Sequence, residues 1–158
     1  MTALTVIEHT AVASAASREV LTSRLGAEEY GIDILAVQEI RRYEAPTRIA
    51  NAAGHLLGVM NLRGAIVPIV DLRRHLGLPA ENGIDTVTVV VNVASRTLGL
   101  VVDAVSDVVA LQPGHIQPCP ALGSATDDGF IVALATVDGA DGPRLLQLTD
   151  LAALLRHL

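Results

Sequence analysis

One segment of this 158-residue chain occurs twice. Residues 31–40 read Gly-Ile-Asp-Ile-Leu-Ala-Val-Gln-Glu-Ile, and residues 99–108 read Gly-Leu-Val-Val-Asp-Ala-Val-Ser-Asp-Val, with Gly, Ala, Val and an acid at matching places. A shorter match relates residues 69–72, Ile-Val-Asp-Leu, to residues 148–151, Leu-Thr-Asp-Leu. Each half is too small to carry independent chemistry, whereas two packed halves leave a cleft in which a partner segment can lie. The repeat therefore favours binding over catalysis.

The apolar residues of the chain are aliphatic rather than aromatic. Hydrophobic residues make up 51% of the sequence but aromatic ones only 2%, so Val, Ile, Leu and Ala must fill the core. Such side chains suit pleated sheets better than aromatic-lined ligand pockets. The net charge is −6 and the 11 basic residues are all Arg, which argues against a nucleic-acid partner or an anionic membrane surface.

Short β-branched runs bounded by Gly, Asp, Asn or Pro predict strands along most of the chain. Asp71 is expected to cap a short helix that ends before Gly77, and Thr149 or Asp150 to cap a terminal helix. Strand meanders this short, present twice, predict a mainly β protein with two small barrels rather than a flat sandwich. The expected strands cover residues 20–25, 30–35, 37–42, 57–62, 65–70, 86–93, 97–102, 105–111, 131–137 and 144–147.

The sequence predicts one domain preceded by a tail. Residues 1–17 lack both the positive start and the apolar stretch of a signal peptide, so we expect a flexible N-terminal tail. Residues 18–158 form the expected domain, with interleaved lobes over roughly residues 30–85 and 86–145 and the terminal segments packing across them. Polar residues interrupt the most apolar run, which does not suit a membrane span. We therefore expect a cytoplasmic chain, without membrane insertion, that is monomeric on its own.

Catalytic and metal-binding motifs are missing from the sequence. It contains no phosphate-binding loop with Lys, no Gly-x-Ser-x-Gly elbow and no His pair at zinc spacing. The single cysteine, Cys119, cannot form an internal disulfide and is interpreted as a small loop residue. Asp103 and Asp107 are interpreted as strand-end or turn acids. No catalytic residue, metal or cofactor is therefore predicted.

Glu39 and Arg63 are the charged residues whose role stays open. Arg63 lies in the sequence Asn-Leu-Arg-Gly, residues 61–64, where a tight turn would project a guanidinium able to make directional, bidentate contacts. The alternative is a surface arginine in a loose ion pair with Glu39, worth about 0–1 kcal/mol. Composition and spacing alone do not separate these two interpretations.

Three segments carry a family resemblance when they are taken in order. Residues 28–41 read Glu-Glu-Tyr-Gly-Ile-Asp-Ile-Leu-Ala-Val-Gln-Glu-Ile-Arg, residues 47–51 read Thr-Arg-Ile-Ala-Asn, and residues 58–72 read Gly-Val-Met-Asn-Leu-Arg-Gly-Ala-Ile-Val-Pro-Ile-Val-Asp-Leu. They closely resemble CheW, the family of bacterial chemotaxis coupling proteins, and the resemblance runs from about residue 18 to residue 155. It implies two five-stranded β-barrel lobes packed together.

The resemblance also implies a function and its partners. A protein of this family is a non-catalytic adaptor that links the regulatory domain of the histidine kinase CheA to the cytoplasmic tip of methyl-accepting chemotaxis receptors. Its location is the cytoplasm, at receptor arrays on the inner membrane. By the same resemblance Val37 and Gly58 match positions that meet the kinase. Glu39 and Arg63 match the charged pair near the receptor, and Val105, in the repeated segment, is expected to line the cleft there.

Alternatives to this assignment stay open. Val37 and Val105 are strand valines, which are usually core residues. Ser23 and Ala36 stand where the family commonly has an aromatic residue and Lys, so a paralogue in a non-flagellar pathway such as pilus motility is one alternative. A small β-barrel ligand carrier or enzyme is another. It would need a polar pocket, for which the candidates are Glu39, Arg63, Asp103 and Asp107.

Overall fold

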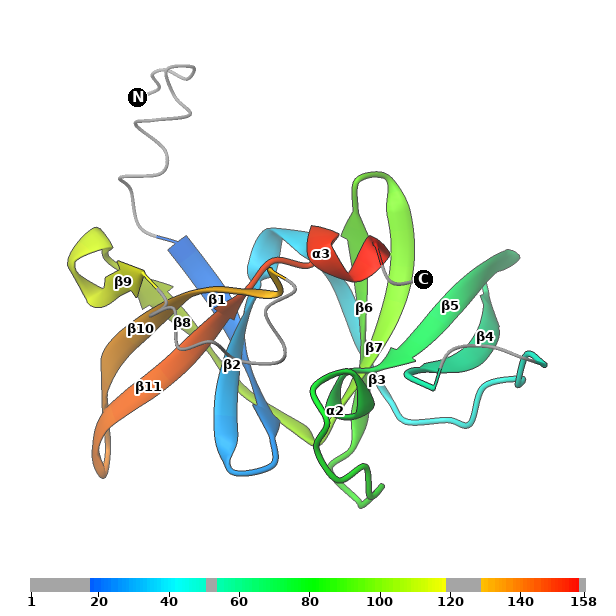
Figure 1. The fold of residues 1–158 in the computed structure, drawn as a ribbon, viewed down its shortest axis with the longest axis horizontal. Helices are drawn as coiled ribbons and strands as arrows, with labels where there is room; N and C mark the ends of the chain where they lie inside the picture. The colour runs from blue at the N-terminus through cyan, green and yellow to red at the C-terminus, as the bar shows by residue number, and fades with distance from the viewer. Residues whose placement is uncertain (1–17, 51–53, 119–128, 157–158) are drawn as a thin grey trace.

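The computed structural model describes residues 18–50, 54–118 and 129–156 (Figure 1). Its helical elements are short: η1 (Ile34–Ala36), α2 (Leu72–His75), η2 (Pro113–His115) and α3 (Ala152–Leu155). No helix in this part of the chain is long and apolar enough to span a membrane. The predicted tail, residues 1–17, and Cys119 lie outside the described residues. The strands are β1 (Arg18–Leu25), β2 (Glu28–Asp33), β3 (Val37–Arg42), β4 (Leu56–Leu62), β5 (Ala65–Asp71), β6 (Val87–Val93), β7 (Arg96–Val102), β8 (Ala104–Leu111), β9 (Ile116–Pro118), β10 (Ile131–Gly139) and β11 (Gly142–Thr149).

The strands form two sheets that lie side by side (Figure 1). Lobe A is the six-stranded sheet with the order β8-β1-β2-β11-β10-β9, and lobe B is the five-stranded sheet with the order β3-β6-β7-β5-β4. The two orders agree when β8, β1, β2, β11 and β10 are matched to β3, β6, β7, β5 and β4. The repeat in the sequence is therefore a repeat in the fold, and β9 is the extra strand of lobe A.

The repeated segments are the places where the chain passes from one lobe to the other. Residues 31–40 run from β2 in lobe A through η1 to β3 in lobe B, and residues 99–108 run from β7 in lobe B to β8 in lobe A. The predicted lobe boundary between residues 85 and 86 is wrong, because β6 and β7 pair with β3 and β5 in lobe B. The first crossover thus supplies lobe B with its edge strand β3, and the second supplies lobe A with its edge strand β8.

Gly31 and Gly99 recur because each lies where two parallel strands meet. Gly31 in β2 is level with Leu148 in β11, and Gly99 in β7 is level with Ile69 in β5. A Cβ at Gly31 would lie 2.9 Å from Leu148 Cδ2, and a Cβ at Gly99 would lie 2.5 Å from Ile69 Cδ1. A close-packed interior does not accommodate such contacts. Glycine therefore lets the aliphatic side chain of the neighbouring strand fill this space.

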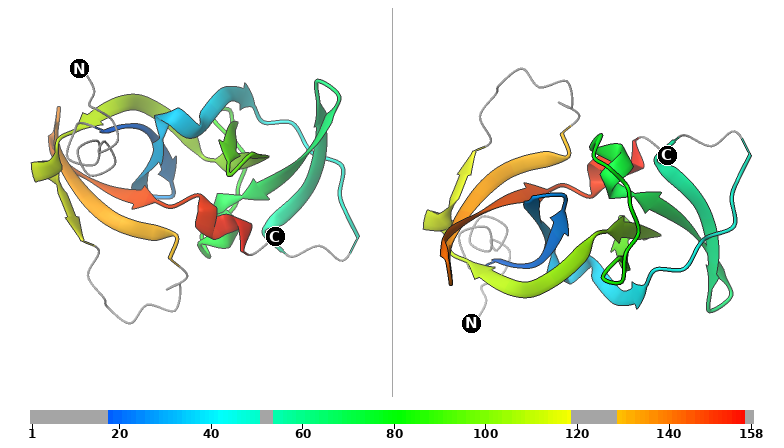
Figure 2. Two further views of the ribbon diagram at one scale, coloured as in Figure 1. Left: turned by 90° about the horizontal axis from the view of Figure 1, so that it is seen from above. Right: turned by 90° about the horizontal axis from the view of Figure 1, so that it is seen from below.

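The lobes are curved sheets rather than closed barrels (Figure 2). Among the described residues, strand pairing ends at β8 and β9 in lobe A and at β3 and β4 in lobe B. In lobe B the chain after β3 reaches across to the other edge, where Thr47 and Val59 exchange two backbone hydrogen bonds of 2.9 Å. The predicted two-lobed β architecture is confirmed, with curved sheets of six and five strands in place of two five-stranded barrels.

A large apolar cluster lies between the two lobes and joins them. It combines Leu25 and Ile32 of lobe A with Val89, Leu98 and Leu100 of lobe B, and all five side chains are fully buried. These aliphatic side chains stand on the facing surfaces of the two sheets, as the composition predicts. Burial of apolar area on this scale is what makes the two lobes one domain.

Aspartates at matching places in the shorter repeat bind backbone N–H groups at the start of the two α-helical turns. The Asp71 carboxylate accepts a hydrogen bond of 2.9 Å from the Arg73 N–H at the start of α2. The Asp150 carboxylate accepts one of 3.1 Å from the Ala152 N–H at the start of α3. Of the two predicted terminal caps, Asp150 is the one that contacts the helix, although the residue at the N-cap position is Leu151. Leu154 of α3 is buried in the cluster between the lobes.

Candidate functional site

Arg63 stands at the tip of the hairpin between β4 and β5. Arg63 and Gly64 are the two turn residues, with φ angles of 51° and 87°. Positive φ at both positions belongs to the type I′ turn, whose twist matches that of the flanking strands. The Asn61 side chain supports the turn by accepting a hydrogen bond of 2.9 Å from the Gly64 N–H. The predicted turn is confirmed, and it holds an arginine side chain that is 74% exposed.

Glu39 on β3 is the acid that Arg63 meets. Arg63 Nη2 donates a hydrogen bond to Glu39 Oε1, and Arg41 Nη1 donates one of 3.1 Å to Glu39 Oε2. The hydrogen bonds from Arg63 and Arg41 lower the pKa of the Glu39 carboxyl from its ordinary value. Since β3 and β4 are opposite edges of lobe B, this contact joins the two edges across the curve of the sheet. The sequence-predicted charged pair therefore meets in space.

Lobe A carries an equivalent contact that sequence reasoning missed. Asp107 takes the place of Glu39 in the repeat and lies on the edge strand β8, as Glu39 lies on β3. Arg144 of β11 donates to both Asp107 carboxylate oxygens at 3.3 Å and also binds Glu29. The interpretation of Asp107 as a strand-end acid is wrong, because it lies within β8 and binds Arg144. The acid shared by the two repeated segments could have indicated Asp107, whereas no local sequence pattern indicates Arg144.

We expect Asp107→Asn to reduce the change in unfolding free energy between neutral and acid pH. Hydrogen bonds from Arg144 and then Thr22 lower the folded-state pKa of Asp107. Its carboxylate therefore stabilises the fold above the unfolded-state value of about 3.9, and this contribution is lost as pH falls through the lower folded-state value. Urea unfolding at about pH 7 and about pH 3 should differ less for Asp107→Asn than for the wild type. The exposed Asp138→Asn is the control, and a wild-type profile for Asp107→Asn would refute the role.

Val37 and Val105 occupy matching places in the two crossovers. Val37 begins β3 directly after η1, and Val105 lies near the start of β8 opposite Ser23 of β1. Both side chains are half-buried and pack against the apolar cluster between the lobes. Each therefore helps to hold the lobes together and presents only part of its surface to solvent.

Gly58 of β4 lies beneath the chain segment that bridges from β3. It is buried, and a Cβ at this position would lie 2.0 Å from the Thr47 carbonyl oxygen. The close approach accompanies the two hydrogen bonds between Thr47 and Val59. A larger residue at position 58 would displace Thr47 and Arg48 before it reached a partner. The geometry thus gives Gly58 a supporting role for this segment.

Arg73 of α2 is a buried charge that the sequence reading did not single out. Its guanidinium binds both carboxylate oxygens of Asp71, Asp103 Oδ1 at 3.0 Å, and two acceptors in the chain that follows α2. Asp103 stands between β7 and β8 and also accepts a hydrogen bond of 2.7 Å from the Gly26 N–H. Gly26 belongs to the β1–β2 turn of lobe A. Arg73 and Asp103 therefore link the two lobes through hydrogen bonds.

The candidate acids do not assemble into one polar pocket. Glu39 binds Arg63, Asp103 binds Arg73, and Asp107 binds Arg144, in three separate contacts. In the part of the chain that the structure describes, no three His, Cys, Asp or Glu side chains form a group that could hold a metal ion. What the structure offers instead is a rigid exposed tip at Arg63 and a firm junction between two lobes.

Comparison with known proteins decides the family. Residues 19–158 match the CheW-like domain. The chain belongs to the CheW-like family. The resemblance found in the sequence is confirmed, and a single CheW-like domain spans both lobes.

Relatives of this CheW-like chain carry chemotaxis names. A chemotaxis protein CheW from Klebsiella aerogenes is 46% identical over 142 residues, which cover 87% of this chain and 81% of the relative. A chemotaxis protein CheW from Rhizobium meliloti is 38% identical over 135 residues, covering 85% and 84%. The crystal structure of the scaffolding protein TtCheW from Thermoanaerobacter tengcongensis matches with a TM-score of 0.74 at 27% identity, covering 84% of this chain and 88% of that one.

Proposed function

We propose that this CheW-like protein is a non-catalytic adaptor that couples chemoreceptors to the histidine kinase CheA. The observation that carries the proposal is family membership over residues 19–158, with relatives named as chemotaxis proteins and a scaffold. An adaptor works by proximity, because holding kinase and receptor in a fixed geometry raises their effective concentration and shifts the kinase between its states. Such work needs rigid surfaces and no cofactor.

The proposed receptor-binding residues are Glu39, Arg63 and Val105. Glu39 orients the Arg63 guanidinium at the hairpin tip, while most of the Arg63 side chain stays exposed. A guanidinium held in this way suits a carboxylate or a backbone carbonyl on the receptor's cytoplasmic tip. Val105 would add apolar contact at the junction between the lobes.

The proposed kinase-binding residues are Val37 and Gly58, which would meet the regulatory domain of CheA. Val37 presents part of its side chain beside the crossover to lobe B, and Gly58 supports the segment at Thr47. The protein would act in the cytoplasm, be recruited to receptor arrays at the inner membrane and be monomeric when alone.

We expect Arg63→Glu to abolish receptor binding while the protein stays folded. The side chain is exposed and its ion pair is at the surface, so stability should change by less than about 1 kcal/mol. Reversing the charge removes the directional donor and sets two acids side by side. Calorimetric titration with a purified receptor-tip fragment and with the CheA regulatory domain, beside urea unfolding, measures each effect.

Arg96→Glu is the matched control for this experiment. Arg96 is also an exposed arginine at a hairpin of lobe B, so its reversal changes the net charge equally. It should keep receptor binding. Wild-type receptor affinity in Arg63→Glu would exclude Arg63 from the site. Failure of the wild-type protein to bind either purified partner would overturn the adaptor function itself.

A further inference from the structure

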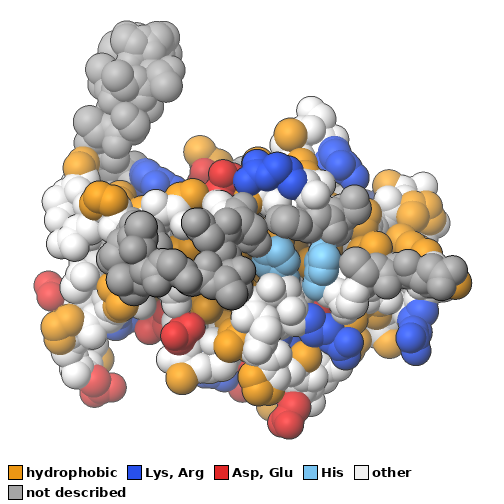
Figure 3. Space-filling model, in the orientation of Figure 1, with side chains coloured by type: hydrophobic (Ala, Val, Ile, Leu, Met, Phe, Trp, Pro, Cys, Tyr) orange, Lys and Arg blue, Asp and Glu red, His pale blue; other side chains and the backbone are white. Residues whose placement is uncertain are grey.

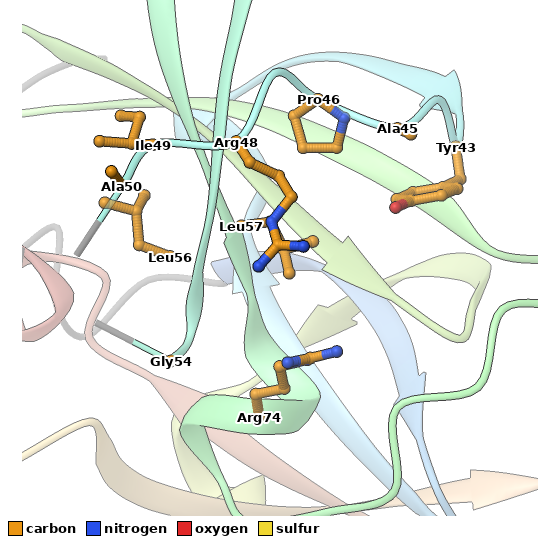
Figure 4. Close-up of a pocket in the computed structure, with 10 residues that line it drawn as sticks. All are labelled: Tyr43, Ala45, Pro46, Arg48, Ile49, Ala50, Gly54, Leu56, Leu57 and Arg74. Carbon is orange, nitrogen blue, oxygen red and sulfur yellow. The ribbon is translucent and has the colours of Figure 1, made fainter. Parts of the chain in front are cut away.

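A cavity of about 720 Å³ lies between the segment after β3, strand β4 and helix α2 (Figure 4). Its apolar lining includes Tyr43, Pro46, Ile49, Leu56 and Leu57. None of the residues proposed above is among its lining residues, and only Gly58, which supports the segment at Thr47 and Arg48, lies directly beside it.

Two arginines supply the charge of this cavity. Arg48 extends from the bridging segment toward Arg74, which rises from α2 on the opposite wall (Figure 4). Arg48 is exposed and forms no ion pair with any described residue. Arg74 Nε lies 3.7 Å from Asp71 Oδ2, but Arg73 already binds the same carboxylate at 2.9 Å. No acidic side chain is present among the described lining residues, so only the long contact between Arg74 and Asp71 offsets the positive charge of the cavity.

The charge stands out against the rest of the molecule. The chain has a net charge of −6. In the view of Figure 3 the acidic side chains lie mainly on the side of lobe A, whereas several arginines lie on the side of lobe B. An acidic partner would therefore be attracted to this side of lobe B more than to the acidic side of lobe A that the same view shows.

The cavity is held in shape before anything binds. The hydrogen bonds between Thr47 and Val59 fix the segment that carries Arg48 and Ile49. Gly58 lets this segment lie directly on β4. Since these contacts fix the backbone at Thr47, a ligand need not order that part of the wall on binding, and the entropy cost falls.

We propose that this cavity is a docking site for an acidic segment of a partner protein, with apolar side chains between its carboxylates. The apolar floor takes the aliphatic groups, and Arg48 and Arg74 bind the carboxylates on either side. A small ligand is usually buried over most of its surface, but Ile49 is 45% exposed and Arg48 is exposed, so this cavity is open. A chain segment that continues beyond the cavity suits that shape.

The test uses the full-length protein and a fluorescein-labelled peptide of Glu-Leu-Glu-Gly repeats, followed by fluorescence polarisation. The acidic peptide should bind, and its affinity should fall as salt is raised. Arg48→Glu and Arg74→Glu should each weaken binding by about tenfold or more, because both place like charges together. Arg96→Glu changes the net charge equally, lies outside the cavity and should bind as the wild type does.

Three results would overturn the proposal. One is equal affinity for a Gln-Leu-Gln-Gly peptide, since the carboxylates would then be irrelevant. Another is wild-type binding by both Arg48→Glu and Arg74→Glu, with unfolding curves showing that each variant is folded. The third is citrate competing at the peptide's own affinity, which would mark a small-anion site. None of these measurements uses kinase or receptor, so they can fail while the adaptor function stands.

Discussion

Replacing Arg73 with Met should lower the free energy of unfolding by about 3–5 kcal/mol. The side chains of Arg73 and Asp71 are only 1% and 2% exposed. Without the guanidinium, the buried Asp71 carboxylate keeps only the longer contact of 3.7 Å to the exposed Arg74, and Asp103 loses a donor. Because Asp103 also holds the Gly26 N–H, the change loosens the link between lobes A and B. Urea unfolding followed by circular dichroism measures the loss.

Arg74→Met provides the matched comparison for this prediction. Arg74 is the next residue of the same helix, but its side chain is 53% exposed and contacts Asp71 only at 3.7 Å. Its replacement should therefore cost less than about 1 kcal/mol. Similar losses in the two variants would show that burial of the Arg73 charge does not stabilise the junction.

Local features of the fold could be predicted from the sequence. The Asn-Leu-Arg-Gly turn follows from the positive φ that its last two residues adopt and from an Asn side chain that bonds within the turn. The cap at Asp71 likewise depends on a backbone N–H two residues away. The strands other than β9 (Ile116–Pro118) were found because β-branched runs mark them, whereas β9 lies in a Pro-containing stretch that does not show this pattern. In each case the deciding interaction lies within a few residues.

The partners of strands and charges could not be predicted in the same way. Nothing local shows that β3 leaves the sheet of β2, because the choice depends on whether the Val37 backbone pairs with Val91, far along the chain. The sequence Leu-Arg-Arg-His suggests a surface position for Arg73, and only the structure shows that Asp103 lies beside it. The glycines at 31 and 99 were visible as a repeat. Their reason, a parallel neighbour filling the space, appears only in three dimensions.

In the candidate site too, local features could be predicted from the sequence and distant contacts could not. Glu39 and Arg63 form the charged pair that the family resemblance implies, whereas the local sequence predicts only the turn that holds Arg63. Arg48 and Arg74 are 26 positions apart in number, and their convergence depends on the Thr47–Val59 bridge, which has no sequence signature. The family resemblance gives Gly58 a role at the kinase but not its close approach to Thr47, which only the structure shows.

Gly58→Ala should lower the free energy of unfolding by about 3 kcal/mol, at the upper end of the usual cost of overpacking. The added Cβ would lie 2.0 Å from the Thr47 carbonyl oxygen and 2.7 Å from its carbonyl carbon. Both are backbone atoms, so the segment must move and the Thr47–Val59 hydrogen bonds must lengthen. Gly54→Ala is the control, because no heavy atom lies within 4 Å of a Cβ there, and its stability should stay within about 0.5 kcal/mol of the wild type.

The same pair of variants separates two explanations for Gly58 in kinase binding. If Gly58→Ala is destabilised and also loses affinity for the acidic peptide, the substitution acts by displacing Thr47 and Arg48, and any loss of CheA binding follows from that displacement. If Gly58→Ala is as stable as Gly54→Ala and still loses CheA binding, the bridging segment has not moved and Gly58 itself meets the kinase. The 2.0 Å approach to Thr47 favours the first outcome, because a backbone carbonyl fixed by hydrogen bonds cannot give way as a flexible side chain does.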